Sequence, residues 1–217
     1  MNRTFRHVNS VMVWVLSIVS IASFCGCAGM NPMALESEPG TLELTSKSVG
    51  LFTLMTSNQY KPNYEPDVKS IEVISQGTGE AARYRVTKPH SQEKEHCFEY
   101  LISVDLPPGT YTVGDVAGLS PEFLTIGSFR FPVGASFELP PNAVVYLGHV
   151  DMVNRKLNEG EQRSGSIFPL IDQGVSGYAD GTFDVSISDK SNADIPLFEQ
   201  TYPELEKHII TKCIMKR

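Results

Sequence analysis

The alternation of side chains from Cys97 to Leu106 constrains the fold more than any other stretch of the chain. The even positions are large and apolar, and the odd positions are mostly polar or small: Phe98, Tyr100, Ile102, Val104 and Leu106 against Cys97, Glu99, Leu101, Ser103 and Asp105. Strict alternation of this length is typical of an antiparallel strand with one buried face. The sequence therefore predicts a half-buried strand here.

Similar patterns recur from Thr41 to the end of the chain. Strands are predicted at residues 49–55, 71–73, 84–86, 128–131, 136–139, 143–152 and 182–188. The tight turn Pro107-Pro108-Gly109 follows the strongest strand, because Pro presets φ and Gly permits the reversal. Short strands with turn signals at this spacing predict a mainly β fold, a single antiparallel β-sandwich over residues 41–217.

The C-terminal end changes period. Thr201-Tyr202-Pro203-Glu204 matches a capping box with Pro in the first turn. Apolar residues at 205, 209, 210 and 213 then share one helical face, which predicts a short C-terminal helix on the edge of the sandwich. A closing strand at residues 209–215 is the competing interpretation, because Ile and Thr also suit strands.

The N-terminus has the layout of a secretory signal. Arg3, Arg6 and His7 precede an apolar run at residues 11–24, and small residues follow it. A helix needs roughly 20 apolar residues to cross a bilayer, so a permanent transmembrane anchor is disfavoured. A plain secreted protein and a cytoplasmic protein with a buried apolar N-terminus remain the alternatives.

The sequence Phe24-Cys25-Gly26-Cys27 resembles the lipobox of bacterial lipoproteins, with Phe for the usual Leu and an extra Cys at position 25. The resemblance implies cleavage after Gly26, a diacylglyceryl group on the Cys27 thiol and an acylated new amino terminus. Two or more acyl chains anchor a protein stably, whereas one does not. Ala28 after the anchor implies the outer membrane, on its periplasmic face. The predicted organisation is a signal-peptide helix at 1–26, a flexible tether at 27–40 and one domain at 41–217.

Cysteine usage follows from this arrangement. The chain has four Cys, and cleavage and lipidation leave Cys97 and Cys213. Two thiols in an oxidising compartment tend to pair, so a disulfide between them is predicted. Two separate buried cysteines are the alternative.

The charge balance restricts the partners. Removing residues 1–26 lowers the basic count from 18 to 16 and keeps all 25 acidic residues, so the mature charge is 16 − 25 = −9. An acidic protein is a poor candidate for binding nucleic acid, or anionic headgroups through a basic patch. We expect the lipid on Cys27 to be the contact with the membrane.

Two further stretches carry a resemblance. Residues 106–113 resemble the signature turn of prealbumin-like β-sandwich modules, such as carboxypeptidase regulatory domains and surface-protein repeats. Phe131-Pro132-Val133 and residues 142–148 are similar to a group of uncharacterised bacterial lipoproteins with one sandwich domain. The resemblance implies a fold and no activity, because such sandwiches host many functions.

Motifs for chemistry are weak. Residues 77–82 fit G-x-G-x-x-A, but the alternation that follows favours a hairpin loop over a cofactor site. His90 and His96 lack the spacing of a zinc site. His149 and Asp151 share one strand face and need a third group to form an acid–base pair.

Aspartates 172, 180, 184, 189 and 194 are interpreted as turn or solvated residues. No catalytic residue, metal or cofactor is predicted, and the protein is not expected to be an enzyme.

Two functions follow as hypotheses. The first is an envelope lipoprotein of structural or interaction type that contacts another envelope protein through an edge strand or loop. The second is a module that binds a sugar or small molecule, using aromatic loop residues such as Tyr60, Tyr64 and Tyr178.

Overall fold

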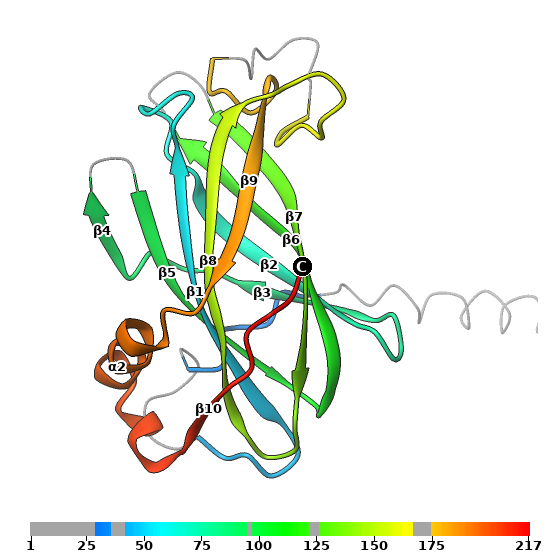
Figure 1. The fold of residues 1–217 in the computed structure, drawn as a ribbon, viewed down its shortest axis with the longest axis vertical. Helices are drawn as coiled ribbons and strands as arrows, with labels where there is room; N and C mark the ends of the chain where they lie inside the picture. Colours follow the sequence, from blue (N-terminus) through cyan, green and yellow to red (C-terminus); the bar gives the residue numbers. More distant parts are fainter. Residues whose placement is uncertain (1–28, 36–41, 95–96, 122–125, 167–174) are drawn as a thin grey trace, which may run out of the picture.

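The computed structural model describes residues 29–35, 42–94, 97–121, 126–166 and 175–217 (Figure 1). The predicted signal peptide and Cys27 lie outside these residues. The described chain is mainly β, as the sequence predicts, and its strands form two sheets with one sheet lying behind the other in Figure 1. Side chains from both sheets join one hydrophobic core.

The first sheet has the strand order β10-β8-β1-β5-β4, and β9 also pairs with β8. Its strands are β1 (Ser48–Asn58), β4 (Ser91–Lys94), β5 (Cys97–Leu106), β8 (Val144–Lys156), β9 (Gly181–Ser188) and β10 (Ile210–Lys212). The pairs β1–β8 and β10–β8 are parallel, so the prediction of a wholly antiparallel architecture is wrong for this sheet. Parallel neighbours need long crossovers, and the chain builds the other sheet between β1 and β8.

The second sheet is antiparallel throughout, in the order β3-β2-β6-β7. Its strands are β2 (Asp67–Ser75), β3 (Ala81–Arg85), β6 (Gly109–Pro121) and β7 (Ile126–Leu139). The two strands predicted at 128–131 and 136–139 are one long strand, β7. The predicted hairpin is confirmed: Gly79 has φ 73° and its N–H donates to the Ser75 carbonyl at 2.9 Å.

Strand β5 differs from its prediction, because both of its faces are buried. Glu99, Leu101 and Ser103, expected to face solvent, are 6%, 5% and 0% exposed. A helix and the N-terminal segment cover this outer face of the first sheet. There Leu101 packs in a second apolar cluster with Leu35 and Phe198. Alternation alone does not reveal that another element will cover the polar side.

The C-terminal helix lies in a different place from the prediction. The helix is α2 (Ser191–Thr201), a 3-10 turn η2 (Pro203–Lys207) follows, and then β10. The predicted helix after Thr201 is therefore wrong, and the competing strand is found at Ile210–Lys212. The run of Ile and Thr suits a strand beside β8.

The N-terminal segment, residues 29–35, joins the two sheets at one side. The Asn31 N–H donates to the Arg83 carbonyl of β3 at 2.7 Å. Met33 enters the core and is 1% exposed, and the Ala34 N–H donates to the Ser103 carbonyl of β5 at 3.0 Å. The interpretation of residues 27–40 as a flexible tether is thus wrong for 31–35, because their backbone and apolar side chains belong to the body.

The C-terminal segment, residues 210–217, joins the sheets at the other side. It pairs with β8 in the first sheet, and the Cys213 and Met215 N–H groups continue that pairing. Lys216 exchanges two backbone hydrogen bonds with Ser136 of β7 in the second sheet, at 2.7 and 3.0 Å. Met215 is 4% exposed and packs in the shared core. Each terminal segment therefore links an edge of one sheet to the other sheet through a buried Met.

Candidate functional site

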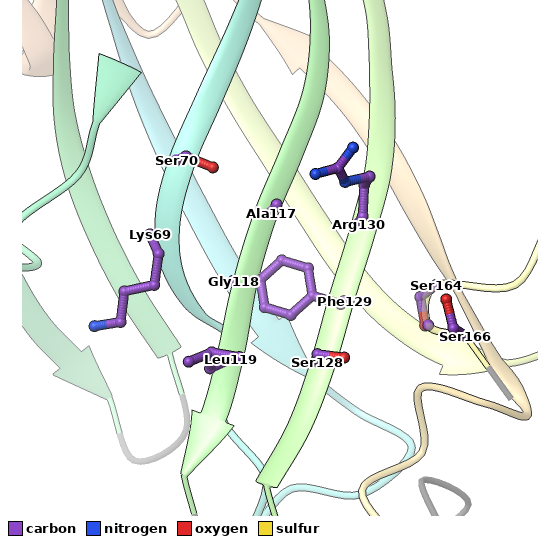
Figure 2. A pocket seen from close by; sticks show the side chains of 11 residues that line it. Lys69, Ser70, Ala117, Gly118, Leu119, Ser128, Phe129, Arg130, Ser164 and Ser166 are labelled. Atoms are coloured by element: carbon purple, nitrogen blue, oxygen red, sulfur yellow. The ribbon is translucent and has the colours of Figure 1, made fainter. Parts of the chain in front are cut away.

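An open cleft of about 490 Å³ lies on the outer face of the second sheet (Figure 2). Across the sheet, Ser70 of β2 pairs with Ala117 of β6, and Ala117 pairs with Arg130 of β7, so the cleft spans three strands. The lining residues are Lys69, Ser70, Ala117, Gly118, Leu119, Ser128, Phe129, Arg130, Ser164, Gly165 and Ser166.

Two cations flank the cleft, and both have carboxylate neighbours. Lys69 contacts Asp67 at 2.6 Å, and Arg130 lies 3.8 Å from Asp115. The side chains of Lys69 and Arg130 are 46% and 60% exposed. Exposed pairs of this kind contribute about 0–1 kcal/mol, so both cations remain able to turn towards a ligand.

Gly118 and Phe129 lie at the floor of the cleft. They are cross-strand partners, and a Cβ at 118 would collide with the Asp67 carbonyl and the Phe129 ring. The ring is 3% exposed and packs in the core beside Tyr178 and Phe183. The cleft therefore offers hydroxyls and cations, and its aromatic residue does not form an exposed stacking platform.

One wall of the cleft is held firmly at Ser164. The Arg130 N–H donates to the Ser164 carbonyl at 2.8 Å. The Ser164 hydroxyl is buried and lies 3.1 Å from both Asn154 Oδ1 and the Tyr178 carbonyl. These contacts fix the wall against β8 and β7, so the cleft is preformed at this side.

A second group of polar residues lies under α2, on the outer face of the first sheet. Tyr146 and His149 of β8 both contact Oδ2 of Asp194 in α2, at 2.7 Å from the Tyr146 hydroxyl and 3.0 Å from His149 Nδ1. The other ring nitrogen of His149 is 3.4 Å from Asp151, which lies 3.6 Å from Lys190. The third group that the sequence interpretation of His149 and Asp151 required is thus Asp194.

The electrostatics of this group favour a charged histidine. Burial alone lowers the pKa of His149, but its contacts with Asp151 and Asp194 outweigh burial and raise that pKa to about 9. Burial likewise opposes ionisation of Asp194, yet His149 and Tyr146 keep the pKa of Asp194 below its usual value. At neutral pH an imidazolium lies between two carboxylates, which leaves no lone pair for a general base.

Ser188 is one candidate for a nucleophile, because it pairs with His149 across β8 and β9, as Thr53 does across β1 and β8. Among the described residues the buried Oγ of Ser188 has no hydrogen-bond partner, so it is not bonded to the His149 ring. The bond between His149 and Asp194 holds α2 on the sheet. The interpretation of Asp194 as a turn or solvated residue is wrong, because it lies in α2 and is 4% exposed; the helix that carries it was not predicted.

The three tyrosines proposed for ligand binding do not form a site. Tyr178 is fully buried, and its hydroxyl donates to the Tyr64 carbonyl at 3.0 Å. The Tyr60 hydroxyl donates to Asp180 at 2.9 Å. Tyr178 is a core residue whose hydroxyl fixes the loop at Tyr64, so this part of the ligand-binding hypothesis is wrong.

The predicted disulfide between Cys97 and Cys213 is not found. Cys97 begins β5 and pairs with Ser57 at the end of β1. Cys213 bonds Tyr146 near the start of β8, which pairs with Leu51 near the start of β1. Six residues of strand span about 20 Å, far beyond the ~7 Å that a disulfide allows between Cα atoms.

The other candidates lie apart. His90 is exposed, and His96 and Asp172 lie outside the described residues. In the part of the chain that the structure describes, no group of three or more His, Cys, Asp or Glu side chains could hold a metal ion. No described helix is long and apolar enough to cross a membrane.

Comparisons with known proteins add little. No family model matches the chain, and no curated protein matches it. A crystal structure of a leucine-rich repeat protein from Bacteroides thetaiotaomicron VPI-5482 resembles part of it, with 18% identity over 50% of this chain and 14% of that chain. The TM-score is 0.34, so this likeness supports no conclusion about fold or function.

Proposed function

We propose that the protein is a lipoprotein of the bacterial envelope, of structural or interaction type and without catalytic activity. Its signal peptide is residues 1–26, and lipid on Cys27 holds it in the outer membrane, facing the periplasm. The N-terminal segment supports this proposal: Asn31 and Met33 bind the body four and six residues after Cys27. A chain that begins at Cys27 keeps all of these contacts.

We also propose that the fold is a β-sandwich of the prealbumin-like type. Two sheets around one core and the tight turn between β5 and β6 support it. The parallel pairs β1–β8 and β10–β8 are its departure from the usual antiparallel pattern.

The partner is another envelope protein, and the cleft on the second sheet is where it binds. One observation supports this choice: α2 covers the outer face of the first sheet, while the cleft face is open. Edge-strand pairing is the weaker route. Asn31 pairs with β3, and Ser164 and Lys216 occupy backbone positions on β7, so both edges of the second sheet are partly blocked.

A carbohydrate is the second candidate ligand for the same cleft. Its several serine hydroxyls and two cations suit a polar ligand, and its volume is within the range of small-molecule sites. The burial of Phe129 weighs against a sugar, because sugars commonly stack on exposed rings.

Affinity capture from crosslinked envelopes tests the partner. Ser128→Trp fills the cleft, and Glu206→Trp, on η2, places the same side chain at an exposed position elsewhere. We expect a protein that the wild-type chain and the Glu206→Trp control capture and the Ser128→Trp variant loses. Equal capture by all three chains would refute the cleft as the binding surface.

Incorporation of labelled palmitate tests the anchor. Wild-type protein should take up label and Cys27→Ser should not. An unlabelled wild-type protein would show that the lipoprotein proposal is wrong, whatever the cleft binds.

A further inference from the structure

A second, mainly apolar cleft has a volume of about 740 Å³. It is bounded by the β2–β3 hairpin on one side and by the turn between β5 and β6 on the other. Val73, Ala82, Leu106 and Tyr111 are among the residues that line it. Ser75, Thr78 and Glu80 of the hairpin give it a polar rim.

The walls of this cleft are fixed by contacts that do not involve a ligand. The Tyr111 hydroxyl donates to the Pro107 carbonyl at 2.7 Å, and its ring stacks on Phe137 with centroids 5.7 Å apart. Across the cleft, the Ser75 N–H donates to the Glu80 carbonyl at 2.9 Å and closes the hairpin. The cleft is therefore preformed. Val73, Leu106 and Tyr111 also belong to the core and form its floor, and Ala81 and Ala82 are its more exposed apolar residues.

The direction of the N-terminal segment leads towards this cleft. Asn31 bridges Tyr84 in the parallel sense, so Met30 and Gly29 lead away from it on the side of the residues that precede Tyr84. Those residues of β3 are Ala81 and Ala82, which line the cleft. Ala82 lies two residues before Tyr84, a distance of about 7 Å along the strand.

Cys27 is near enough for its lipid to reach the cleft. It precedes Asn31 by four residues, and an extended chain spans at most about 14 Å over that length. We propose that the cleft binds a fatty acyl chain of the protein's own anchor, the one on the amino group of Cys27. This inference rests on the proposed lipidation and adds a site for one of its chains.

The chemistry of the cleft suits this occupant. An acyl chain carries no polar group beyond its amide, and each methylene that it buries strengthens binding about fourfold. Two chains of the diacylglyceryl group remain for the membrane, and two chains are enough for stable anchoring. The body of the protein is then held against the bilayer on the side of the β2–β3 hairpin.

Fluorescence of cis-parinaric acid, a fatty acid that emits in apolar surroundings, tests the site. Three forms are compared: the unlipidated mature chain with Cys27→Ser, the same chain with Ala81→Trp, and the lipidated protein in detergent. We expect the unlipidated chain to bind the probe. Ala81→Trp places an indole over the cleft and should weaken binding by at least about tenfold, since it displaces two or three methylenes.

The lipidated protein distinguishes its own acyl chain from fatty acids of other origin. If its chain occupies the cleft, it should bind the probe at least about tenfold more weakly than the unlipidated chain. Equal binding by both forms would overturn the assignment to its own anchor. Failure of the unlipidated chain to bind would overturn the site itself, even if palmitate labels Cys27.

Two further variants distinguish a loss of probe binding at this cleft from a general loss of folding. Ser128→Trp fills the cleft of Figure 2 and should leave probe binding unchanged. Thr78→Trp, on the hairpin rim, should weaken binding as Ala81→Trp does. Equal binding by Thr78→Trp and Ser128→Trp would contradict the placement of the site. The mass of the lipidated protein reports separately whether Cys27 is acylated, so failure of the lipoprotein proposal is recognised on its own.

Discussion

The two terminal segments perform the same structural task by different means. The N-terminal segment connects β3 to β5 through isolated backbone bonds at Asn31 and Ala34, with Met33 between them. The C-terminal segment forms a strand along β8 before it reaches β7 at Lys216. The N-terminal closure therefore depends on isolated bonds and on two buried side chains, Met33 and Leu35, whereas the C-terminal closure depends on strand pairing and on α2, which precedes it.

Among the changes that test this difference between the two segments, truncation of Met33 should reduce stability the most. Met33→Ala leaves a cavity in the shared core and should lower the free energy of unfolding by about 2–4 kcal/mol. Urea denaturation of the mature chain measures it. Met30→Ala, at a side chain 45% exposed, is the control and should change stability by less than about 0.5 kcal/mol. A loss for Met33→Ala as small as that of the control would show that the N-terminal segment does not complete the core.

High pH should loosen the C-terminal segment and spare the N-terminal one. The folded pKa of His149 is raised from 6.5 to about 9, so its stabilising effect is complete below pH 6.5 and is lost as pH rises through 9. The free energy of unfolding should fall by an amount on the order of 2 kcal/mol. The carboxylates that stabilise the charged imidazole surround it only in the folded chain, so deprotonation removes a stabilisation that the unfolded chain never had. Hydrogen exchange measures it at the Cys213 and Ala34 amides, which bond β8 and β5.

Faster exchange at Cys213 than at Ala34, beyond the general rise with pH, supports the link from α2 to the C-terminal segment. His149→Gln is the control, because it removes the titrating group; its stability should not change over that window. Equal protection at both amides from pH 6 to pH 10 would contradict the proposed role of His149.

A matched pair of prolines tests the backbone bonds to the second sheet, because Asn31 and Lys216 each donate one bond to it and accept one from it. Asn31→Pro removes the donor to Arg83, and Lys216→Pro removes the donor to Ser136. Each should cost about 1 kcal/mol in thermal or urea unfolding. The effect of Asn31→Pro should be the larger, because Met33 follows two residues later and has no strand to hold it. If Lys216→Pro lost more stability than Asn31→Pro, the C-terminal segment would be the one that depends more on its backbone bonds to the second sheet.

The cysteines should give the smallest effect. Cys97→Ser and Cys213→Ser should each change stability by less than about 0.5 kcal/mol, since neither thiol lies in the core. A thiol assay of the denatured, unreduced chain of residues 27–217 with Cys27→Ser should find two reactive groups. One or none would mean that a cross-link forms despite the distance set by the strand register.

Patterns within single strands were enough to predict the β class, the bounds of β5 and the β2–β3 hairpin. Each of these depends on local alternation or turn chemistry, which the sequence contains directly. The core positions of β5 followed in the same way, and Tyr100 and Ile102 are buried as predicted.

Features that depend on distant parts of the chain could not be predicted. The parallel pairing of β1 and β8, and the contact of His149 with Asp194, join residues far apart in sequence. Helix α2 carries Pro196 and lacks a side-chain cap at Lys190, so neither start signals nor propensity indicated it. The candidate site could not be predicted for the same reason, because the residues that line the cleft come from β2, β6, β7 and the loop at Ser164.

The pairing of β1 with β8 also affects the order of folding. Leu51, Phe52 and Leu54 of β1 are fully buried in the finished protein, and β8 is made much later along the chain. The contacts between β1 and β8 join residues that are far apart in sequence, and such contacts raise the contact order. A high contact order slows folding and prolongs the exposure of apolar side chains. During synthesis, β1 emerges before the strand that protects it. The nascent chain therefore depends on β5, its antiparallel neighbour, or on a chaperone, to shield β1 in the interval.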